Sequence, residues 1–185
     1  MIIVQSKRAS LAKMQQQYPD TAILDVTSRG PQPWIRFSPF YPHGHIPVPF
    51  SPGEFSTSVE GIWQGLKVFE HADVDPSRLR VTTMKGLKRS ARVYGNVLGH
   101  RQGLAGERLL SYAEARRTIY LPAYHWVLTN CVQDLLAELK TQSTRQTVIL
   151  LDYETNCDLD DFTRPLSHAG LVKRYIEQNW PTLER

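Results

Sequence analysis

Three polar side chains in residues 58–70 share one stripe of a predicted helix. Glu60, Gln64 and Lys67 follow one another at spacings of four and three residues, which are the spacings of neighbours on a helical surface. Ser58 can cap this helix, which leaves Glu60 in the first turn, where free backbone donors favour a carboxylate. A carboxylate and an amine held this close can move protons or stabilise a developing positive charge. An ordinary surface stripe has the same pattern, so composition leaves both interpretations open.

The rest of the same segment supplies the apolar face that would position these groups. At about 100° per residue, its apolar side chains fall within roughly one third of the helical circumference. They are Val59, Ile62, Trp63, Leu66 and Phe69. Trp63 lies between the apolar and polar stripes, so it is expected at the edge of the core, next to the polar groups.

Charge is unevenly distributed along the chain. Residues 78–108 carry eight arginines and lysines and a single acid, whereas residues 152–161 carry five acids and no base. A basic segment opposite an acidic loop suits an enzyme that binds phosphates on one side and does chemistry on the other. The candidate phosphate-binding or nucleic-acid-binding residues are Lys85, Lys88, Arg89, Arg92 and Arg101. A solvated surface has the same composition and stays an alternative.

Hydrophobic periodicity and cap residues predict the elements around these groups. The expected helices cover residues 9–17, 58–70, 85–94, a segment beginning at the capping box of Ser111 and Glu114, 124–139 and 168–176. The expected strands cover residues 21–27, 33–38, 78–83 and 147–151. Residues 31–52 hold seven of the twelve prolines together with several aromatics, which predicts a rigid, packed loop.

Length and composition define the class of protein. The 185 residues, with 41% hydrophobic and 22% charged side chains, predict a single globular domain over residues 1–185. The mixture of elements predicts an α+β fold, mostly helical, with a small β-sheet. No apolar run approaches a membrane span, so no membrane partner is expected. With two cysteines there is no disulfide framework, and the expected location is the cytoplasm.

Several motifs together resemble the NADAR superfamily, the riboflavin-intermediate N-glycosidases also called YbiA-like. The resemblance begins with F-S-P-F-Y-P at residues 37–42 and S-V-E-G-I-W-Q-G-L-K-V-F at residues 58–69. It continues through K-G-L-K-R-S-A-R at residues 85–92, L-L-D-Y-E-T-N-C-D at residues 150–158 and the closing helix at residues 166–176. The chain departs from the family pattern at Gly61, where the family has histidine, and at Pro39, where it has asparagine.

The resemblance implies cleavage of an N-glycosidic bond, which breaks through an oxocarbenium-like sugar. A carboxylate near the anomeric carbon stabilises that charge and accepts a proton from the attacking water. Glu60 is the first candidate for this carboxylate, and Asp152, at the end of a predicted buried strand, is the second. Lys67 invites a different mechanism, in which its amine attacks the anomeric carbon and forms a Schiff base. Neutralising Glu60 or binding a phosphate is the alternative role for this lysine.

Further residues would contact the substrate in such an enzyme. Aromatic side chains can stack on a base or a flavin-like ring, although aromatics of this kind also form ordinary core. The candidate substrate-binding residues are Trp63, Gln64, Phe37, Phe40, Tyr41, Arg36 and Asn156.

The expected substrate is a modified nucleotide within DNA. The enzyme would either excise a modified base and leave an abasic site or remove ADP-ribose from guanine, and antiviral defence would suit either activity. The alternatives are a small-molecule N-glycosidase acting on a phosphorylated riboflavin-pathway intermediate and a nucleic-acid-binding module without catalysis. No cofactor and no metal are expected, because His43 and His45 lack a clustered third ligand. The oligomeric state is left open.

Overall fold

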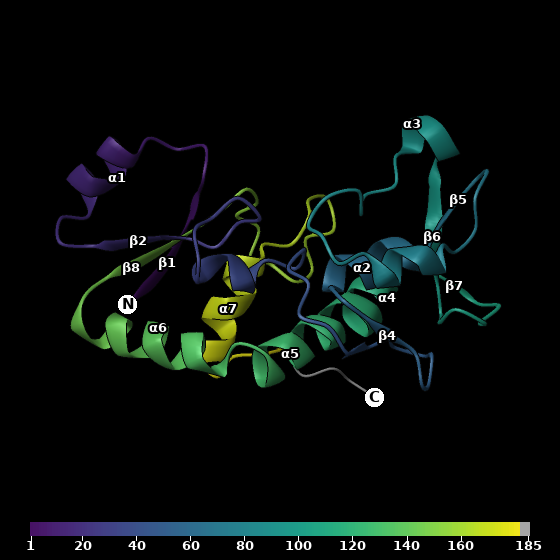
Figure 1. The fold of residues 1–185 in the computed structure, drawn as a ribbon. Coiled ribbons are helices and arrows are strands. Elements are labelled where there is room, and N and C mark those ends of the chain that lie inside the picture. The colour runs from purple at the N-terminus through teal and green to yellow at the C-terminus, as the bar shows by residue number, and fades with distance from the viewer. Residues whose placement is uncertain (182–185) are drawn as a thin grey trace. The chain divides into compact units, whose positions relative to one another are not determined.

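The chain divides into two units, which are described separately. The computed structural model describes residues 1–181 (Figure 1). Unit 1 consists of residues 1–38 and the described residues from 132 onward, and unit 2 consists of residues 39–131. The expectation of a single domain over the whole chain stays a prediction.

A parallel three-stranded sheet forms the centre of unit 1. Its strands are β1 (Ile2–Ser6), β8 (Val148–Asp152) and β2 (Ala22–Asp25), in that spatial order. All five residues of β8 are buried, as a short, wholly apolar run in a central parallel strand requires. The predicted strands at 21–27 and 147–151 are therefore confirmed, whereas β1 was not predicted.

Helices surround this sheet. They are α1 (Leu11–Gln17), α6 (Gln133–Arg145) and α7 (His168–Ile176), and both α6 and α7 contact β8. The Oγ atom of Ser167 accepts a hydrogen bond from the amide of Gly170 and so caps α7, as predicted.

The strand predicted at residues 33–38 is wrong. Residues Trp34–Phe37 form a 3₁₀ turn, η1, in which the amide of Arg36 donates to the Pro33 carbonyl. Side chains three apart share a face in this geometry. Trp34 and Phe37 are therefore both buried, a pattern that alternation along a strand does not give.

Unit 2 carries two antiparallel sheets. The smaller pairs β3 (Ile46–Pro47) with β4 (Phe55–Ser56), and the larger has the order β5 (Lys67–Phe69), β6 (Val97–Arg101), β7 (Leu109–Leu110). The remaining elements are α2 (Val59–Gly65), η2 (Pro76–Arg80), α3 (Ala91–Tyr94), α4 (Tyr112–Ala115), the π-helical turn η3 (Arg116–Tyr120) and α5 (Leu121–Asn130).

Three predicted elements in unit 2 need correction. The helix expected over 58–70 ends at Gly65, because residues 67–69 pair with β6 and form β5. The strand expected over 78–83 is instead the 3₁₀ turn η2, which begins at Pro76 and is capped by the side chain of Asp75. The basic helix expected over 85–94 is reduced to α3, because Gly86 has a φ of 74°.

In the second half of unit 2, the helices agree more closely with the predictions from cap residues and proline. The capping box of Ser111 and Glu114 opens α4, and Pro122 lies in the first turn of α5, as expected. The helix predicted over 124–139 is interrupted after Asn130, whose side chain donates back to the Trp126 carbonyl.

These elements confirm an α+β class. Among residues 1–181, no helix has both the length and the apolar character needed to cross a membrane.

Candidate functional site

Helix α2 holds Glu60 in its first turn and buries it. Ser58 adopts an extended backbone, and its Oγ accepts a hydrogen bond from the Gly61 amide at 3.0 Å, which caps the helix. The Glu60 amide donates to the Pro39 carbonyl at 2.8 Å. The Glu60 side chain is only 7% exposed, which places a carboxylate in a largely water-excluded position instead of on a plain surface stripe.

The Glu60 carboxylate is oriented by its neighbour one helical turn along. Gln64 Nε2 donates to Glu60 Oε1 at 2.8 Å, and Gln64 Oε1 accepts from the Arg89 amide at 3.0 Å. The amide of Gln64 is therefore fixed at both ends. Among the described residues, Gln64 is the single hydrogen-bond partner of the Glu60 carboxylate, which leaves acceptor capacity on its second oxygen.

The pKa values of Glu60 and Lys67 shift toward each other. Burial raises the pKa of Glu60, against the opposing effects of the Gln64 hydrogen bond and the charges of Lys67 and Lys88. Burial lowers the pKa of Lys67, which the Glu60 charge opposes and Lys88 and Arg89 reinforce. Because the two pKa values shift toward each other, a proton moves between such a carboxylate and amine at a lower free-energy cost than between exposed side chains.

Lys67 lies on β5, not on the helix. Its Nζ is 5.9 Å from the centre of the Trp63 ring, within cation–π range. The His100 ring lies 3.8 Å from the same Trp63 ring, centre to centre, and Tyr112 and Tyr120 meet the indole edge-on at 5.9 and 5.7 Å. Trp63 therefore lies in an aromatic cluster next to the Glu60–Lys67 pair, as its position between the two stripes indicated.

Arg89 is a structural clamp in unit 2. It is buried, and its guanidinium donates to the Lys67 carbonyl at 2.6 Å and the Asp73 carbonyl at 2.8 Å. Its Cζ also lies 4.8 Å from the Phe69 ring centre and 5.1 Å from that of Tyr94. These contacts favour a role in holding β5 over the predicted role in binding phosphate.

The other cations predicted to bind phosphate differ in how far they are engaged. Arg101 forms an ion pair with Asp73 at 3.0 Å and donates to the Glu107 carbonyl at 2.7 Å. Lys85, Lys88 and Arg92 are exposed. Lys88 Nζ lies 5.5 Å from the Phe40 ring centre, and its charge acts on both Glu60 and Lys67. Besides Gln64, which hydrogen-bonds Glu60, Lys88 is therefore a predicted binding residue whose charge acts on the Glu60 carboxylate, and Phe40 contacts Lys88.

The predicted aromatic and arginine residues of the proline-rich segment are divided between the units. In unit 1, Phe37 is fully buried against Trp34, and Arg36 forms an ion pair with Asp134 at 2.7 Å. In unit 2, Tyr41 packs against His43 with ring centres 4.8 Å apart. The burial of Phe37 is that of a core residue.

Asp152, the second candidate carboxylate, is buried in unit 1, where its carboxylate is bound by neighbouring side chains. Its Oδ2 accepts from Ser167 Oγ at 2.7 Å and lies 2.9 Å from His168 Nδ1, while His168 Nε2 contacts the Val26 carbonyl at 2.8 Å. Burial raises the pKa of Asp152, but His168 and the hydrogen bonds outweigh it and hold the value at about 2. These contacts favour a role in joining β8 to α7 over a catalytic one.

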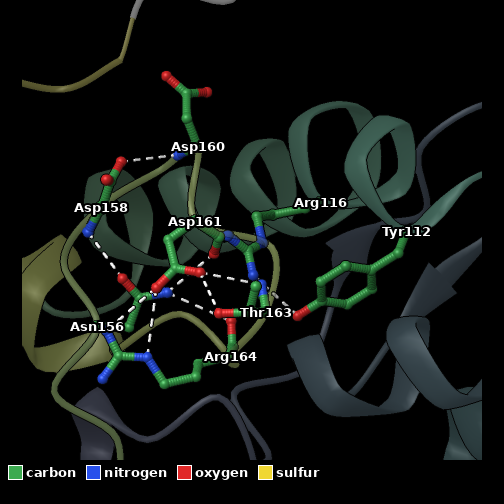
Figure 2. Close-up of polar contacts among 8 residues, drawn as sticks. All are labelled: Tyr112, Arg116, Asn156, Asp158, Asp160, Asp161, Thr163 and Arg164. Carbon is green, nitrogen blue, oxygen red and sulfur yellow. Dashed lines mark hydrogen bonds and ion pairs between the residues drawn. The ribbon is translucent and has the colours of Figure 1, made fainter.

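Asn156 organises the acidic loop of unit 1, as Figure 2 shows. Its Nδ2 donates to the carbonyls of Asp161 and Arg164, and its Oδ1 accepts from the Asp158 amide at 2.9 Å. The side chain is buried, and its amide is used within the loop. Figure 2 also draws a pair from unit 2, in which Arg116 Nη2 donates to Tyr112 Oη at 3.0 Å.

Sequence reasoning missed His100 and His168. His100 lies outside the quoted motifs, His168 lies in the closing helix without an assigned role, and each contacts residues far away in the chain, Trp63 for His100 and Asp152 and Val26 for His168. Within residues 1–181, no three histidine, cysteine, aspartate or glutamate side chains gather as a metal site requires.

The fit of Gly61 against its surroundings gives a first prediction. A Cβ at this position would lie 2.7 Å from the Arg78 carbonyl oxygen and 2.8 Å from Ser56 Oγ. We expect Gly61→Ala to lower the free energy of unfolding by about 1–3 kcal/mol, because backbone must move to relieve the overlap. Urea unfolding measures this. Gly65→Ala on the same helix is the control, since its Cβ would lie 3.2 Å from Leu79 Cδ2 and 3.3 Å from the Asp75 carbonyl oxygen, a milder crowding than at Gly61. Equal losses in the two variants would contradict the steric account.

Comparison with known proteins adds a family. A protein-family model matches residues 6–172, and its description is a family of unknown function, DUF6939. No curated protein matches the chain. The matched range contains both candidate carboxylates, Glu60 and Asp152.

Proposed function

The chain belongs to this family of unknown function, and we propose that it is an N-glycosidase whose catalytic carboxylate is Glu60. The observation that carries the proposal is the burial of this carboxylate in the first turn of α2, where Gln64 orients it and the charge of Lys67 acts on it. A surface glutamate without function would be solvated and free to rotate.

The proposed reaction is hydrolysis of the bond between a sugar C1′ and a base nitrogen. As this bond breaks, positive charge develops on C1′ and the ring oxygen, and the ionised Glu60 stabilises it. Water attacks C1′, Glu60 accepts its proton, and the base leaves with the bonding electron pair and takes up a proton. The raised pKa of Glu60 makes it a better base for the attacking water than an exposed carboxylate.

Lys67 supports an alternative first step. Its amine would attack C1′ and expel the base, which leaves an N-glycosylamine after loss of a proton from nitrogen. The C1′–O4′ bond then breaks, O4′ takes up a proton, and the resulting Schiff base is hydrolysed by water. The lowered pKa of Lys67 favours a nucleophilic free amine. Borohydride reduces such an intermediate to a stable adduct, so an active enzyme that gives no adduct would exclude this route.

The same proposal includes membership of the NADAR/YbiA-like superfamily and the fold of that superfamily. Two departures from the family pattern have local explanations. Gly61 has no room for a side chain beside the Arg78 carbonyl, and the position of Pro39 contributes a backbone carbonyl that holds the Glu60 amide. These contacts support a distinct branch that keeps the carboxylate of the motif.

We propose that the substrate is a modified nucleotide within DNA and that the protein acts in the cytoplasm. Exposed Lys85, Lys88 and Arg92 support phosphate binding. The engagement of Arg89 and Arg101 within the protein reduces the basic surface available to a long polyanion. That reduction favours a second candidate, a small phosphorylated N-glycoside of the riboflavin-pathway type.

The test is to identify the released product. The protein is incubated separately with ADP-ribosylated DNA, hypermodified phage DNA and a phosphorylated ribosylamine, and the products are analysed by mass spectrometry. A free modified base identifies a glycosylase, and free ADP-ribose identifies removal of that group from guanine. Turnover of the ribosylamine alone would move the proposal to the small-molecule candidate. DNA binding without release from any substrate would support a non-catalytic module and overturn the proposal.

A further inference from the structure

His100 is a buried polar residue that the proposed reaction does not use. It lies on β6, the central strand of its sheet, and its side chain is 1% exposed. Within the described chain, neither ring nitrogen makes a hydrogen bond; the Trp63 carbonyl influences the ring without reaching hydrogen-bond geometry. Since nearly all buried polar atoms in proteins have partners, two unsatisfied nitrogens in one side chain need a reason.

The neighbours of His100 are residues of the candidate site. Its Cα is paired across the sheet with that of Lys67, so the two side chains leave the sheet on the same face. Its ring lies against Trp63 with centres 3.8 Å apart and an angle of 36° between the planes. Gly99 lets β7 approach closely, since a Cβ there would lie 2.4 Å from the Leu110 carbonyl oxygen. His100 is paired with Lys67 on one side and with Leu110 on the other, so its ring meets the indole from a strand that is paired on both sides.

The charge of the ring also fits this position. Burial, and then the Lys67 charge, lower the pKa of His100 to about 3, so the ring is neutral at physiological pH. A neutral flat ring supports Trp63 without placing a second cation beside Lys67.

We propose that His100 is a positioning residue that fixes the plane of the Trp63 indole by packing its tilted ring against it, so that a substrate ring meets the indole in one orientation. The proposal deepens the proposed function and rests on it only in taking Trp63 as the surface on which the substrate ring stacks. A flat aromatic ring is required at position 100, whereas a residue that merely fills the core could be any apolar side chain of similar size.

The test compares His100→Phe, which keeps a flat ring, with His100→Leu, which fills the space without one. In protein labelled with 5-fluorotryptophan, the Trp63 fluorine signal is assigned with Trp63→Phe. We expect His100→Leu to lose the upfield ring-current shift of this signal and to bind guanosine monophosphate about tenfold more weakly, while His100→Phe keeps both. An unchanged Trp63 signal in His100→Leu would overturn the proposal.

This design separates the two proposals. If the wild-type protein neither binds the nucleotide nor releases a product, the N-glycosidase function fails, and the fluorine signal still decides whether His100 positions Trp63. If neither variant folds, the Trp63 fluorine signal of the wild-type protein decides. An upfield ring-current shift that is lost on unfolding in urea supports packing of His100 against Trp63, and a signal without that shift overturns the proposal.

Discussion

Replacing Glu60 by glutamine should abolish product release while leaving the fold intact. The amide keeps the size of the carboxylate and can still accept the hydrogen bond from Gln64, but it carries no charge and accepts no proton. We expect kcat to fall by at least about a thousandfold, since both charge stabilisation and base catalysis are lost. The rate is measured on whichever substrate the release assay identifies.

Glu114→Gln is the matched control for this variant. Glu114 also lies in the first turn of a helix in unit 2, where it forms a capping box that glutamine can maintain. The control should keep its turnover, and both variants should unfold near the wild-type temperature. Undiminished turnover in the Glu60 variant would remove this carboxylate from the mechanism, and Asp152 would then be the next candidate to test.

The second large effect is expected at the buried pair of Asp152 and His168. Substituting Asp152 with alanine leaves His168 buried without its carboxylate and removes an acceptor for Ser167 and for the Ala169 amide. Loss of one partner of a buried pair costs about 3–5 kcal/mol. Urea unfolding should show a loss of this size. The control Asp134→Ala, which breaks the exposed ion pair with Arg36 in the same unit, should cost less than about 1 kcal/mol.

The same pair predicts how stability depends on pH. The pKa of Asp152 is depressed to about 2 from 3.8. Its contribution to the free energy of unfolding is therefore complete above about pH 4 and is lost as the pH falls toward 2. Burial lowers the pKa of His168, but the Asp152 charge and its hydrogen bonds prevail and raise it. The contribution of His168 to the free energy of unfolding is therefore complete below about pH 6.5 and is lost as the pH rises through the pKa of His168 in the folded state.

Unfolding midpoints measured from pH 2 to 9 should accordingly pass through a maximum between about pH 4 and 6.5. In Asp152→Ala the alkaline limb should flatten, because the charge that raises the pKa of His168 is gone. Curves for the variant and the wild type that run parallel across this range would show that the pair does not govern the pH dependence.

Elements with complete local signals could be predicted from the sequence. Ser111 with Glu114, Ser167, and the apolar run before Asp152 each specify an element through neighbours close in the chain. The helix expected over 58–70 shows where local reasoning ends. Its apolar spacing continues through Phe69, but the Arg101 amide donates to the Leu66 carbonyl and β6 pairs with the following residues, so a distant strand ends the helix.

The sequence pointed to Glu60 as the candidate carboxylate, but it did not predict which residues surround it. The spacing of Glu60 and Gln64 predicted that they share one face of a helix, and in the structure their side chains form a hydrogen bond there. Arg89 is indistinguishable in sequence from the exposed cations around it, and only the carbonyls of β5 and its neighbours show that it is a clamp. His100 depends on cross-strand pairing with Lys67, for which no spacing rule exists.

The order of strands in unit 1 has a consequence for biosynthesis. Strands β1 and β2 emerge early, yet neither pairs with the other, because β8 lies between them and is made more than 120 residues after β2. A nascent chain therefore holds two apolar edges without hydrogen-bond partners until translation reaches residue 152. Premature termination before β8 should leave these edges open to aggregation, even where the intervening segment has already folded.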